Sequence, residues 1–280
     1  MTSPSGGPGV TTRTPALEAR GVDKTFGHVQ ALREVDFSAE SGEVTALIGD
    51  NGAGKSSLVK VLAGVYGADR GELLVNGDRV YPRSPQDIRA YGIETVYQDL
   101  ALAADLTPYE NVYLGRELHR SGLLGLLRVV DRNRMRTETE KVFSSLNVQI
   151  KDQKVPVASL SGGQQQSVAI ARAAMWAQHM VIMDEPTAAL GVAQTESVLA
   201  LIRRVADSGT GVVLISHNMP DVLAVADSIQ VLRLGERVAT FRRGEAEVTD
   251  LVQAMTSGTG PTGAHGETQN GVNQPEGVQA

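Results

Sequence analysis

The sequence predicts an α/β protein: a parallel sheet, an antiparallel β-subdomain before it, and an inserted helical subdomain. Three short runs, "EVTALIGD", "MVIMDEP" and "GVVLISH", are β-rich and nearly all apolar, which is typical of buried parallel strands covered on both faces. Helical patterns at residues 55–63, 164–177 and 192–206 separate the apolar runs. This alternation of strand and helix indicates an α/β sheet.

The first folded part has the pattern of strands and turns. In "ELLVNGDRV", Asn76 and Gly77 stand between two runs that contain apolar residues, a hairpin signal because both residue types tolerate positive φ. The strand at 43–48 leads into a glycine-rich turn and a helix, and Gly64 falls where a glycine would end that helix. Near the C-terminus, "IQVLRLGERVAT" predicts a last hairpin that turns near Gly235.

Residues 99–160 differ from the rest of the chain. They are mostly polar with a helical pattern, and their apolar positions include Leu114, Leu118, Leu123 and Leu124. We interpret them as a helical subdomain inserted in the sheet. Residues 1–15 and 256–280 are rich in Ser, Thr, Gly and Pro with little to bury, so we expect disordered tails around a folded part at 16–255.

Composition excludes several classes of function. The chain has 280 residues, a net charge of -6 and no cysteine, so disulfides, thiolate zinc sites and cysteine nucleophiles are ruled out. The acidic balance disfavours nucleic acid as a partner. The apolar run at 122–130 is less than half as long as the roughly 20 residues needed to span a bilayer, and the first 15 residues lack the apolar centre of a secretory signal. We therefore expect a cytoplasmic chain that reaches any membrane through a partner.

A phosphate-binding loop is predicted by "GDNGAGKSS", which fits G-x-x-x-x-G-K-[ST] from Gly49 to Ser56. Glycines let backbone N–H groups converge on phosphate, Lys55 neutralises β and γ oxygens, and the Ser56 hydroxyl ligates Mg²⁺. Such a match also arises by chance in roughly one chain in a hundred of this length. The strand before the loop and the helix after it favour the functional interpretation.

Two later strand ends supply the other groups that nucleotide hydrolysis needs. Asp184 and Glu185 follow four apolar residues in "MVIMDEP", which would carry them to the carboxyl edge of the sheet, where ligands bind. Asp184 would hold Mg²⁺ and Glu185 would act as general base; the alternative is a solvated carboxylate pair. His217 ends the next strand, where it could orient water at the γ-phosphate or be structural.

With these motifs the chain resembles the ATP-binding cassette (ABC) ATPases, a family of P-loop NTPases. The glycine loop, Gln98 in "VYQDL", "LSGGQ" at 160–164, "MVIMDE" at 180–185 and His217 occur in family order across nearly all of 16–255. The resemblance implies that Phe26 stacks on adenine and that Val29 flanks the ring, although an aromatic residue there could also belong to the core. It implies that Gln98 reaches Mg²⁺ and the attacking water. The implied phosphate cradle comprises Gly49, Asn51, Gly52, Ala53, Gly54, Lys55, Ser56 and Ser57.

The signature stretch implies a composite site. "LSGGQ" has glycines before a helix but no lysine or carboxylate of its own. In the family, Ser161, Gly162, Gly163 and Gln164 of one copy close over ATP held by another copy. The resemblance therefore implies a second cassette as a partner, forming a homodimer, and stretch 160–164 should be exposed in a single subunit.

Longer phrases resemble one branch of the family, the ATPase subunits of bacterial importers for ribose, xylose and fructose. They include "GDNGAGKSSLVKVLAGVY" and "DEPTAALGVAQT", and the chain holds a single cassette. The branch implies an integral-membrane sugar permease, an extracytoplasmic sugar-binding protein reached through it, and a peripheral location on the cytoplasmic face of the inner membrane. Gly191 stands where many relatives have Asp. Alternatives are an exporter motor, a soluble ABC ATPase acting on DNA or ribosomes, and a regulatory module that does not hydrolyse ATP.

Overall fold

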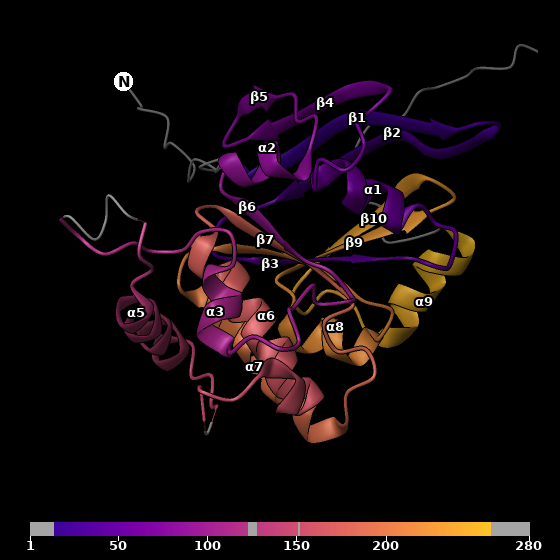
Figure 1. The fold of residues 1–280 in the computed structure, drawn as a ribbon. Coiled ribbons are helices and arrows are strands. Elements are labelled where there is room, and N and C mark those ends of the chain that lie inside the picture. The colour runs from indigo at the N-terminus through magenta and orange to yellow at the C-terminus, as the bar shows by residue number, and fades with distance from the viewer. Residues whose placement is uncertain (1–13, 123–127, 151, 259–280) are drawn as a thin grey trace, which may run out of the picture.

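Within the residues that the computed structural model describes, 14–122, 128–150 and 152–258, ten strands form two sheets (Figure 1). The larger has the order β10-β9-β3-β8-β7-β6 and the smaller β2-β1-β4-β5. The strands of the larger sheet are β3 (Val44–Ile48), β6 (Ile93–Val96), β7 (Met180–Asp184), β8 (Gly211–Ile215), β9 (Ser228–Arg233) and β10 (Glu236–Arg242). Those of the smaller sheet are β1 (Leu17–Phe26), β2 (Val29–Ala39), β4 (Arg70–Val75) and β5 (Asp78–Val80).

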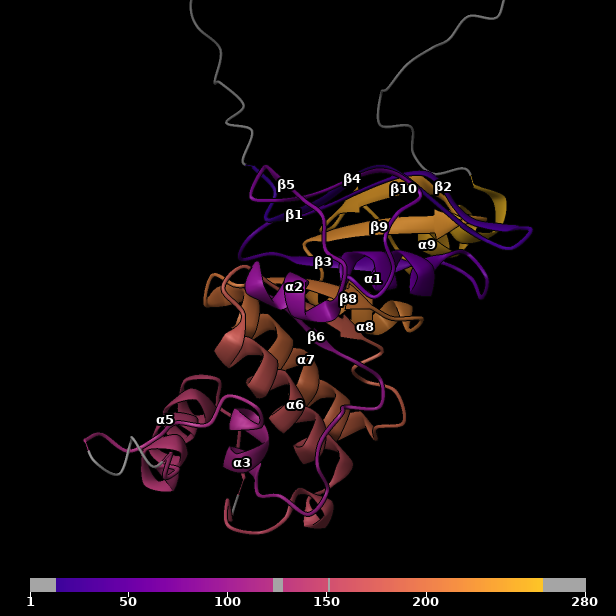
Figure 2. The ribbon, with the colours of Figure 1, turned by 45° about the horizontal axis from the view of Figure 1, so that its top comes forward.

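Helices cover the larger sheet on both faces. They are α1 (Lys55–Leu62), α2 (Pro85–Ala90), α3 (Pro108–Tyr113), α5 (Arg132–Ser145), the 3₁₀ turn η1 (Val157–Ser159), α6 (Gly162–Trp176), α7 (Val192–Asp207), α8 (Met219–Val225) and α9 (Val248–Ser257). On one face, α1 contributes Leu58 and Leu62 to a core that it shares with the antiparallel sheet. The same core contains Phe37 of β2 and Val213 of β8. On the other face, α6 and α7 form a second core with α3 and α5 (Figure 2). The predicted α/β class with an antiparallel subdomain is confirmed.

The parallel strands bring four chain segments to one edge. β6, β7, β8 and β3 are parallel neighbours, so their carboxyl ends lie at the same edge of the sheet. Val44 to Ile48 are all buried, as are all five residues of β8, which accounts for the unbroken apolar runs in the sequence.

Both predicted hairpins are confirmed, and their turns show why they could be predicted. Asn76 and Gly77 have φ of 51° and 86°, and Leu234 and Gly235 have φ of 48° and 85°. Asn76, Gly77 and Gly235 tolerate the left-handed region that such two-residue turns require, whereas Leu234 adopts it at a cost. Gly64 also has positive φ, directly after the cap of α1.

The inserted subdomain is less helical than predicted. In the described part of 99–160, α3 and α5 are separated by turns and loops. Of the apolar positions named in this segment, Leu114 is 52% exposed. Leu118 does pack against the core, as do Tyr113 and Phe143, whereas Leu123 and Leu124 lie outside the described residues.

The C-terminal boundary also shifts. α9 continues to Ser257 and buries Leu251 and Ala254, so the folded part ends later than residue 255. Most of the two predicted tails, 1–13 and 259–280, lies outside the described residues. In the described ranges, the helices are too short or too polar to cross a bilayer.

Candidate nucleotide-binding site

The glycine loop after β3 is shaped by close backbone approach. A Cβ on Gly54 would lie 2.6 Å from the carbonyl oxygen of Ala31, and one on Gly49 would collide with that of Leu232. A Cβ on Gly52 would meet no described atom within 4 Å, yet Gly52 has a φ of 84°, which a side chain would strain. Gly49 and Gly54 therefore serve packing, and Gly52 serves the path of the exposed loop.

Lys55 lies folded back into the loop. Its Nζ donates to the carbonyl oxygens of Gly49 (2.6 Å) and Asp50 (3.0 Å). Burial lowers the pKa of Lys55, and the nearby carboxylates of Glu185 and Asp50 partly oppose that shift. α1 begins at Lys55, and its N-cap, Gly54, has no side chain to accept from the first backbone N–H groups. A cation and a helix N-terminus thus face the same space.

The remaining members of the predicted cradle come from the same turn. Asn51 and Ser56 are exposed, Ser57 is half-buried, and Ala53 is buried. Ala53 contributes its backbone, since its N–H donates to Asp50 (3.1 Å) and its carbonyl accepts from Gly235 (2.9 Å). The turn is therefore fixed to the β9–β10 hairpin.

The two predicted carboxylates stand at the end of β7. Asp184 pairs with Ile215 of β8, and burial raises its pKa, as does the adjacent charge of Glu185. Glu185 has left the strand: its φ is 50° and its N–H donates to the carbonyl of Ile215 (3.0 Å). A non-glycine residue in this conformation is costly and is held only where its surroundings determine it, often at functional sites.

His217 and Gln98 reach the same edge from the neighbouring strands. His217, after β8, places Nδ1 2.8 Å from Oε2 of Glu185. Gln98 follows β6 and is exposed, and β6 is paired with β7 up to Val96 opposite Met183. The structure therefore brings Lys55, Asp184, Glu185, His217 and Gln98 to one sheet edge.

Phe26 and Val29 line a pocket of about 610 Å³ together with Lys55 and the glycine loop. The Phe26 ring is 40% exposed and makes an edge contact with Tyr66 at 5.2 Å, so it is not a core residue. The sequence motifs missed other residues of this wall, namely Gln30, Ala31, Arg33, Leu234 and Gly235. The sequence pattern did single out Gly235, but only as the turn of a hairpin and not as part of a binding pocket.

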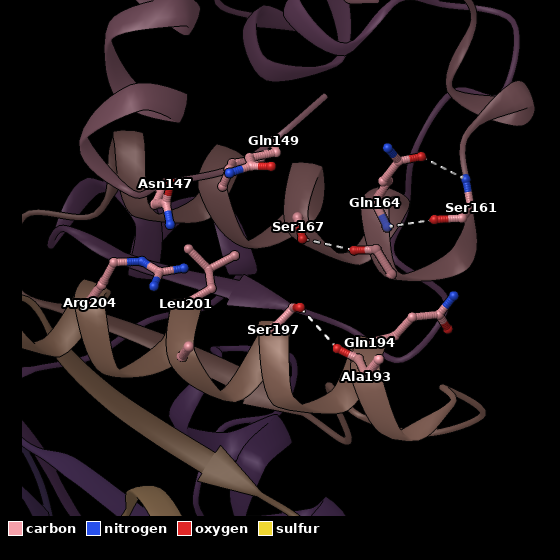
Figure 3. A pocket seen from close by; sticks show the side chains of 13 residues that line it. Asn147, Gln149, Ser161, Gln164, Ser167, Ala193, Gln194, Ser197, Leu201 and Arg204 are labelled. Carbon is pink, nitrogen blue, oxygen red and sulfur yellow. Dashed lines mark hydrogen bonds between the residues drawn. The ribbon is translucent and has the colours of Figure 1, made fainter. Parts of the chain in front are cut away.

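Ser161 and Gln164 cap the start of α6 reciprocally. Ser161 Oγ accepts from the backbone N–H of Gln164 (3.4 Å), and Gln164 Oε1 accepts from that of Ser161 (3.1 Å; Figure 3). This is a capping box. Because Ser161 Oγ accepts in this bond, its hydroxyl hydrogen is left to donate elsewhere.

The expectation that all of 160–164 is exposed is wrong for Gly163, which is buried, and for Leu160 and Gln164, which are half-buried. Ser161 and Gly162 are exposed, but Gly163 is buried against α7. A Cβ there would lie 3.1 Å from both Cβ and Cγ of Gln194. Because α6 and α7 pack side by side at this point, the second signature glycine has a packing role that its motif does not reveal.

The signature lines a different pocket from the glycine loop. This pocket, of about 520 Å³, lies between α6, α7 and the turn after α5 (Figure 3), and its walls include Ser161, Gln164, Gln194 and Arg204. It shares no lining residue with the pocket of Lys55. Within one chain, the structure therefore does not bring residues 161–164 together with the phosphate loop.

Comparisons with known proteins agree with this geometry. The family profile described as "ABC transporter" matches residues 32–188. The fructose import ATP-binding protein FrcA of Rhizobium meliloti is 45% identical over 88% of this chain and 96% of its own length. The xylose/arabinose import ATP-binding protein XylG of Sulfolobus acidocaldarius is 44% identical over 86% of this chain and 94% of its own. The ribose import ATP-binding protein RbsA of Yersinia pestis is 41% identical over 87% of this chain, which spans 46% of that protein.

Solved structures show the same fold. A nucleotide-free ATP-binding cassette from an ABC transporter superposes with a TM-score of 0.73 at 26% identity, covering 85% of this chain and 95% of that one. A dimeric bacterial ABC transporter cassette gives 0.67 at 23% identity, over 81% and 98% of the two chains, which is a likeness of fold alone. With a family profile that matches more than half of its length and full-length relatives above 40% identity, the chain belongs to the ABC transporter family of ATP-binding cassettes.

Proposed function

We propose that the chain is the ATP-hydrolysing subunit of a transporter that imports a monosaccharide. The observation that carries the hydrolytic part is the convergence of Lys55, Asp184, Glu185 and His217 at one sheet edge. A cation for phosphate, an acidic pair and a hydrogen-bonded histidine are the groups that phosphoryl transfer to water requires.

The residues at the edge fit Mg²⁺ as a cofactor. Ser56, Gln98 and Asp184 offer hydroxyl, amide and carboxylate oxygens, the donors that this ion prefers. When bound, the ion neutralises charge on the phosphate oxygens. The adenine would stack on Phe26 beside Val29 in the pocket that also contains Lys55.

The chain's own groups then divide the work. Lys55 exchanges the carbonyls of Gly49 and Asp50 for phosphate oxygens, and the N–H groups of the loop and of α1 hold the same anion. Glu185 takes the proton of the attacking water. His217, whose Nδ1 lies 2.8 Å from Oε2 of Glu185, orients that water. These fixed dipoles and charges supply most of the stabilisation expected for such a reaction.

A second copy completes the site. Because Ser161 lines a pocket separate from that of Lys55, the signature of one subunit would cover ATP bound to another. Ser161 would donate its hydroxyl there, beside the N–H groups of Gly162 and Gly163 and the start of α6 at Gln164.

The import part rests on the relatives, which are named as import proteins for fructose and for xylose or arabinose. It implies an integral-membrane permease, a sugar-binding protein on its outer side, and a peripheral place on the cytoplasmic face of the membrane. An exporter motor would share every residue at this site, so the direction of transport has to be tested on the assembled complex.

Phosphate release from ATP tests the hydrolytic part, with Glu185→Gln as the inactive control. If the wild-type chain releases no phosphate with Mg²⁺ present, alone or with its permease, the chain is a binding or regulatory module instead. Affinity capture from cell membranes tests the import part. A multi-span permease and a sugar-binding protein are expected in the captured complex, and capture of ribosomes or DNA-repair proteins would contradict transport.

A further inference from the structure

Helix α6, which begins at the signature, also holds the loop that follows Gln98. Arg172 of α6 donates from Nη1 to the carbonyl of Ala101 (2.8 Å) and from Nη2 to that of Leu100 (2.9 Å). At 1.5 Å per residue, Arg172 lies about 15 Å along the helix from Gly162. One rigid helix thus has the signature at its start and this loop bonded to its side.

The loop needs such a support. Leu100 and Ala101 have φ of 58° and 44°, a conformation that two successive non-glycine residues hold only when their surroundings determine it. The planar fork of a guanidinium presents two donors in fixed geometry, so it can hold two consecutive carbonyls. A lysine in its place would offer a point charge without that fork.

The charge of Arg172 is matched from β6. Burial lowers the pKa of Arg172, and Glu94 of β6 raises it. Glu94 is itself buried, 8% exposed, with Oε1 2.6 Å from Nη2 of Arg116. The guanidinium stays charged at any physiological pH, so protonation does not alter the link from α6 to the loop.

A second bond ties α6 to the inserted subdomain. Trp176, one turn after Arg172, donates from Nε1 to the carbonyl of Val112 in α3 (2.9 Å). Arg172 and Trp176 therefore lie on one face of α6, and both bind main-chain oxygens of the segment that runs from Gln98 to α3. A displacement of α6 must carry this segment with it.

We propose that Arg172 is a positioning residue that makes the Gln98 loop and the signature move as one unit, and so couples the two ATP sites of a dimer. The proposal rests on the proposed function, in which Gln98 contacts ATP of its own subunit while Ser161 contacts ATP of the partner. An element that both ligands bias transmits a coupling free energy between them. Without the Arg172 bonds, the contact of Gln98 with one ATP and the contact of Ser161 with the other would no longer be linked through α6.

The test measures phosphate release by the full-length chain as a function of ATP concentration. The wild type should show a Hill coefficient approaching about 2, the limit for two sites. Arg172→Ala and Arg172→Lys should lower it to about 1, while ATP binding measured with a fluorescent nucleotide changes less than about twofold. The matched control is Arg243→Ala: Arg243 also donates to two consecutive carbonyls, from Nε to that of Ala226 (3.1 Å) and from Nη2 to that of Val225 (2.9 Å), but these lie outside the Gln98 loop, so the Hill coefficient should stay at the wild-type value.

Hydrogen exchange of the nucleotide-free chain gives a second measurement that does not depend on hydrolysis. Arg172→Lys should speed amide exchange in residues 98–103 and leave the rest unchanged, whereas a misfolded variant would exchange faster throughout. Unchanged exchange in 98–103, a wild-type Hill coefficient in both Arg172 variants, or a Hill coefficient of 1 in a hydrolysing wild type would each overturn the coupling role. Absence of hydrolysis in the wild type would refute the proposed function instead.

Discussion

The imidazole of His217 contacts the carboxylate of Glu185, with Nδ1 2.8 Å from Oε2. The two residues come from neighbouring parallel strands, β8 and β7, and the carboxylate is only 17% exposed while the imidazole is 72% exposed. With Nδ1 donating, Nε2 is the nitrogen left to act on a bound ligand, and Oε1 is the carboxylate oxygen left to accept a proton.

Replacing Glu185 by Gln should separate binding from hydrolysis. Removing a general base lowers the rate about 10²–10⁴-fold, while the isosteric amide keeps the contact to His217. ATP binding should persist and a closed dimer should accumulate, seen as a doubled mass by light scattering with ATP and Mg²⁺. A variant that stays monomeric under these conditions would refute the sandwich of two copies.

Lys55→Ala should weaken ATP binding. A charge-assisted hydrogen bond contributes about 1.5–3 kcal/mol, so the dissociation constant should rise by roughly one to two orders of magnitude. Titration calorimetry measures it. Lys60→Ala is the matched control, because Lys60 lies on the same helix and is exposed. Equal effects of the two substitutions would show that general charge, rather than the loop position, holds the phosphate.

Ser161→Arg should block hydrolysis without blocking ATP binding. The long cation would occupy the space between two copies. ATP binding should persist because Ser161 does not line the pocket of Lys55 in its own chain. Phosphate release and nucleotide binding are measured on the same preparation. Ser159→Arg, on the exposed turn η1, is the control and should keep wild-type activity. Loss of ATP binding in Ser161→Arg would place the signature in its own subunit's site.

Removal of residues 259–280 should leave ATPase activity and the melting temperature unchanged, because their composition predicts a disordered tail. Removal from residue 248 should lower the melting temperature, because α9 buries Leu251 and Ala254 against the β9–β10 side of the sheet. Scanning calorimetry of both truncations decides the boundary. A large loss of stability in the shorter deletion would show that the tail is part of the fold.

Asp227→Asn should reduce stability at neutral pH by about 1.5–3 kcal/mol, the range for a hydrogen bond to a charged group. Burial acts to raise the pKa of Asp227, but hydrogen bonds from Arg203 (2.6 Å) and the N–H of Val44 (2.8 Å) outweigh it and lower the pKa below 3.8. A lowered folded pKa stabilises the protein above the unfolded pKa, and the effect is lost as pH falls through the folded value.

Urea unfolding at pH 7 and at pH 3.5 or below measures the difference between wild type and Asp227→Asn. The difference should narrow as pH falls below about 4, the unfolded pKa of an aspartate. Asp105→Asn, at an exposed position, should change stability little at either pH. If the difference in unfolding free energy between wild type and Asp227→Asn stays constant with pH, the carboxylate charge is not its source.

Local chemistry made most of the sheet edge predictable. Asp184 and His217 follow apolar runs that form buried parallel strands. Because the carboxyl ends of parallel strands lie at one edge of the sheet, both residues are expected at that edge. The exposure of Leu114 could not be predicted, because a leucine in a polar segment carries no sign of which neighbours will cover it. The contacts of Arg172 could not be foreseen either, because they join residues 71 and 72 positions apart through main-chain oxygens, which no side-chain pattern records.

The burial of Gly163 against Gln194 changes how substitutions in the signature have to be interpreted. A side chain at Gly162 would meet Leu190 at the ordinary distance of 3.6 Å, but one at Gly163 would lie 3.1 Å from Cβ and Cγ of Gln194, so the Gln194 side chain on α7 would have to shift. An alanine scan through the motif would therefore report two different quantities: the proposed contact with the nucleotide of a second copy at Ser161 and Gly162, and the packing of α6 on α7 within the chain at Gly163. Melting temperatures taken alongside activities distinguish the two glycines, since only Gly163→Ala should lower both. Ser161→Ala also removes the N-cap of α6 and should lower the melting temperature as well.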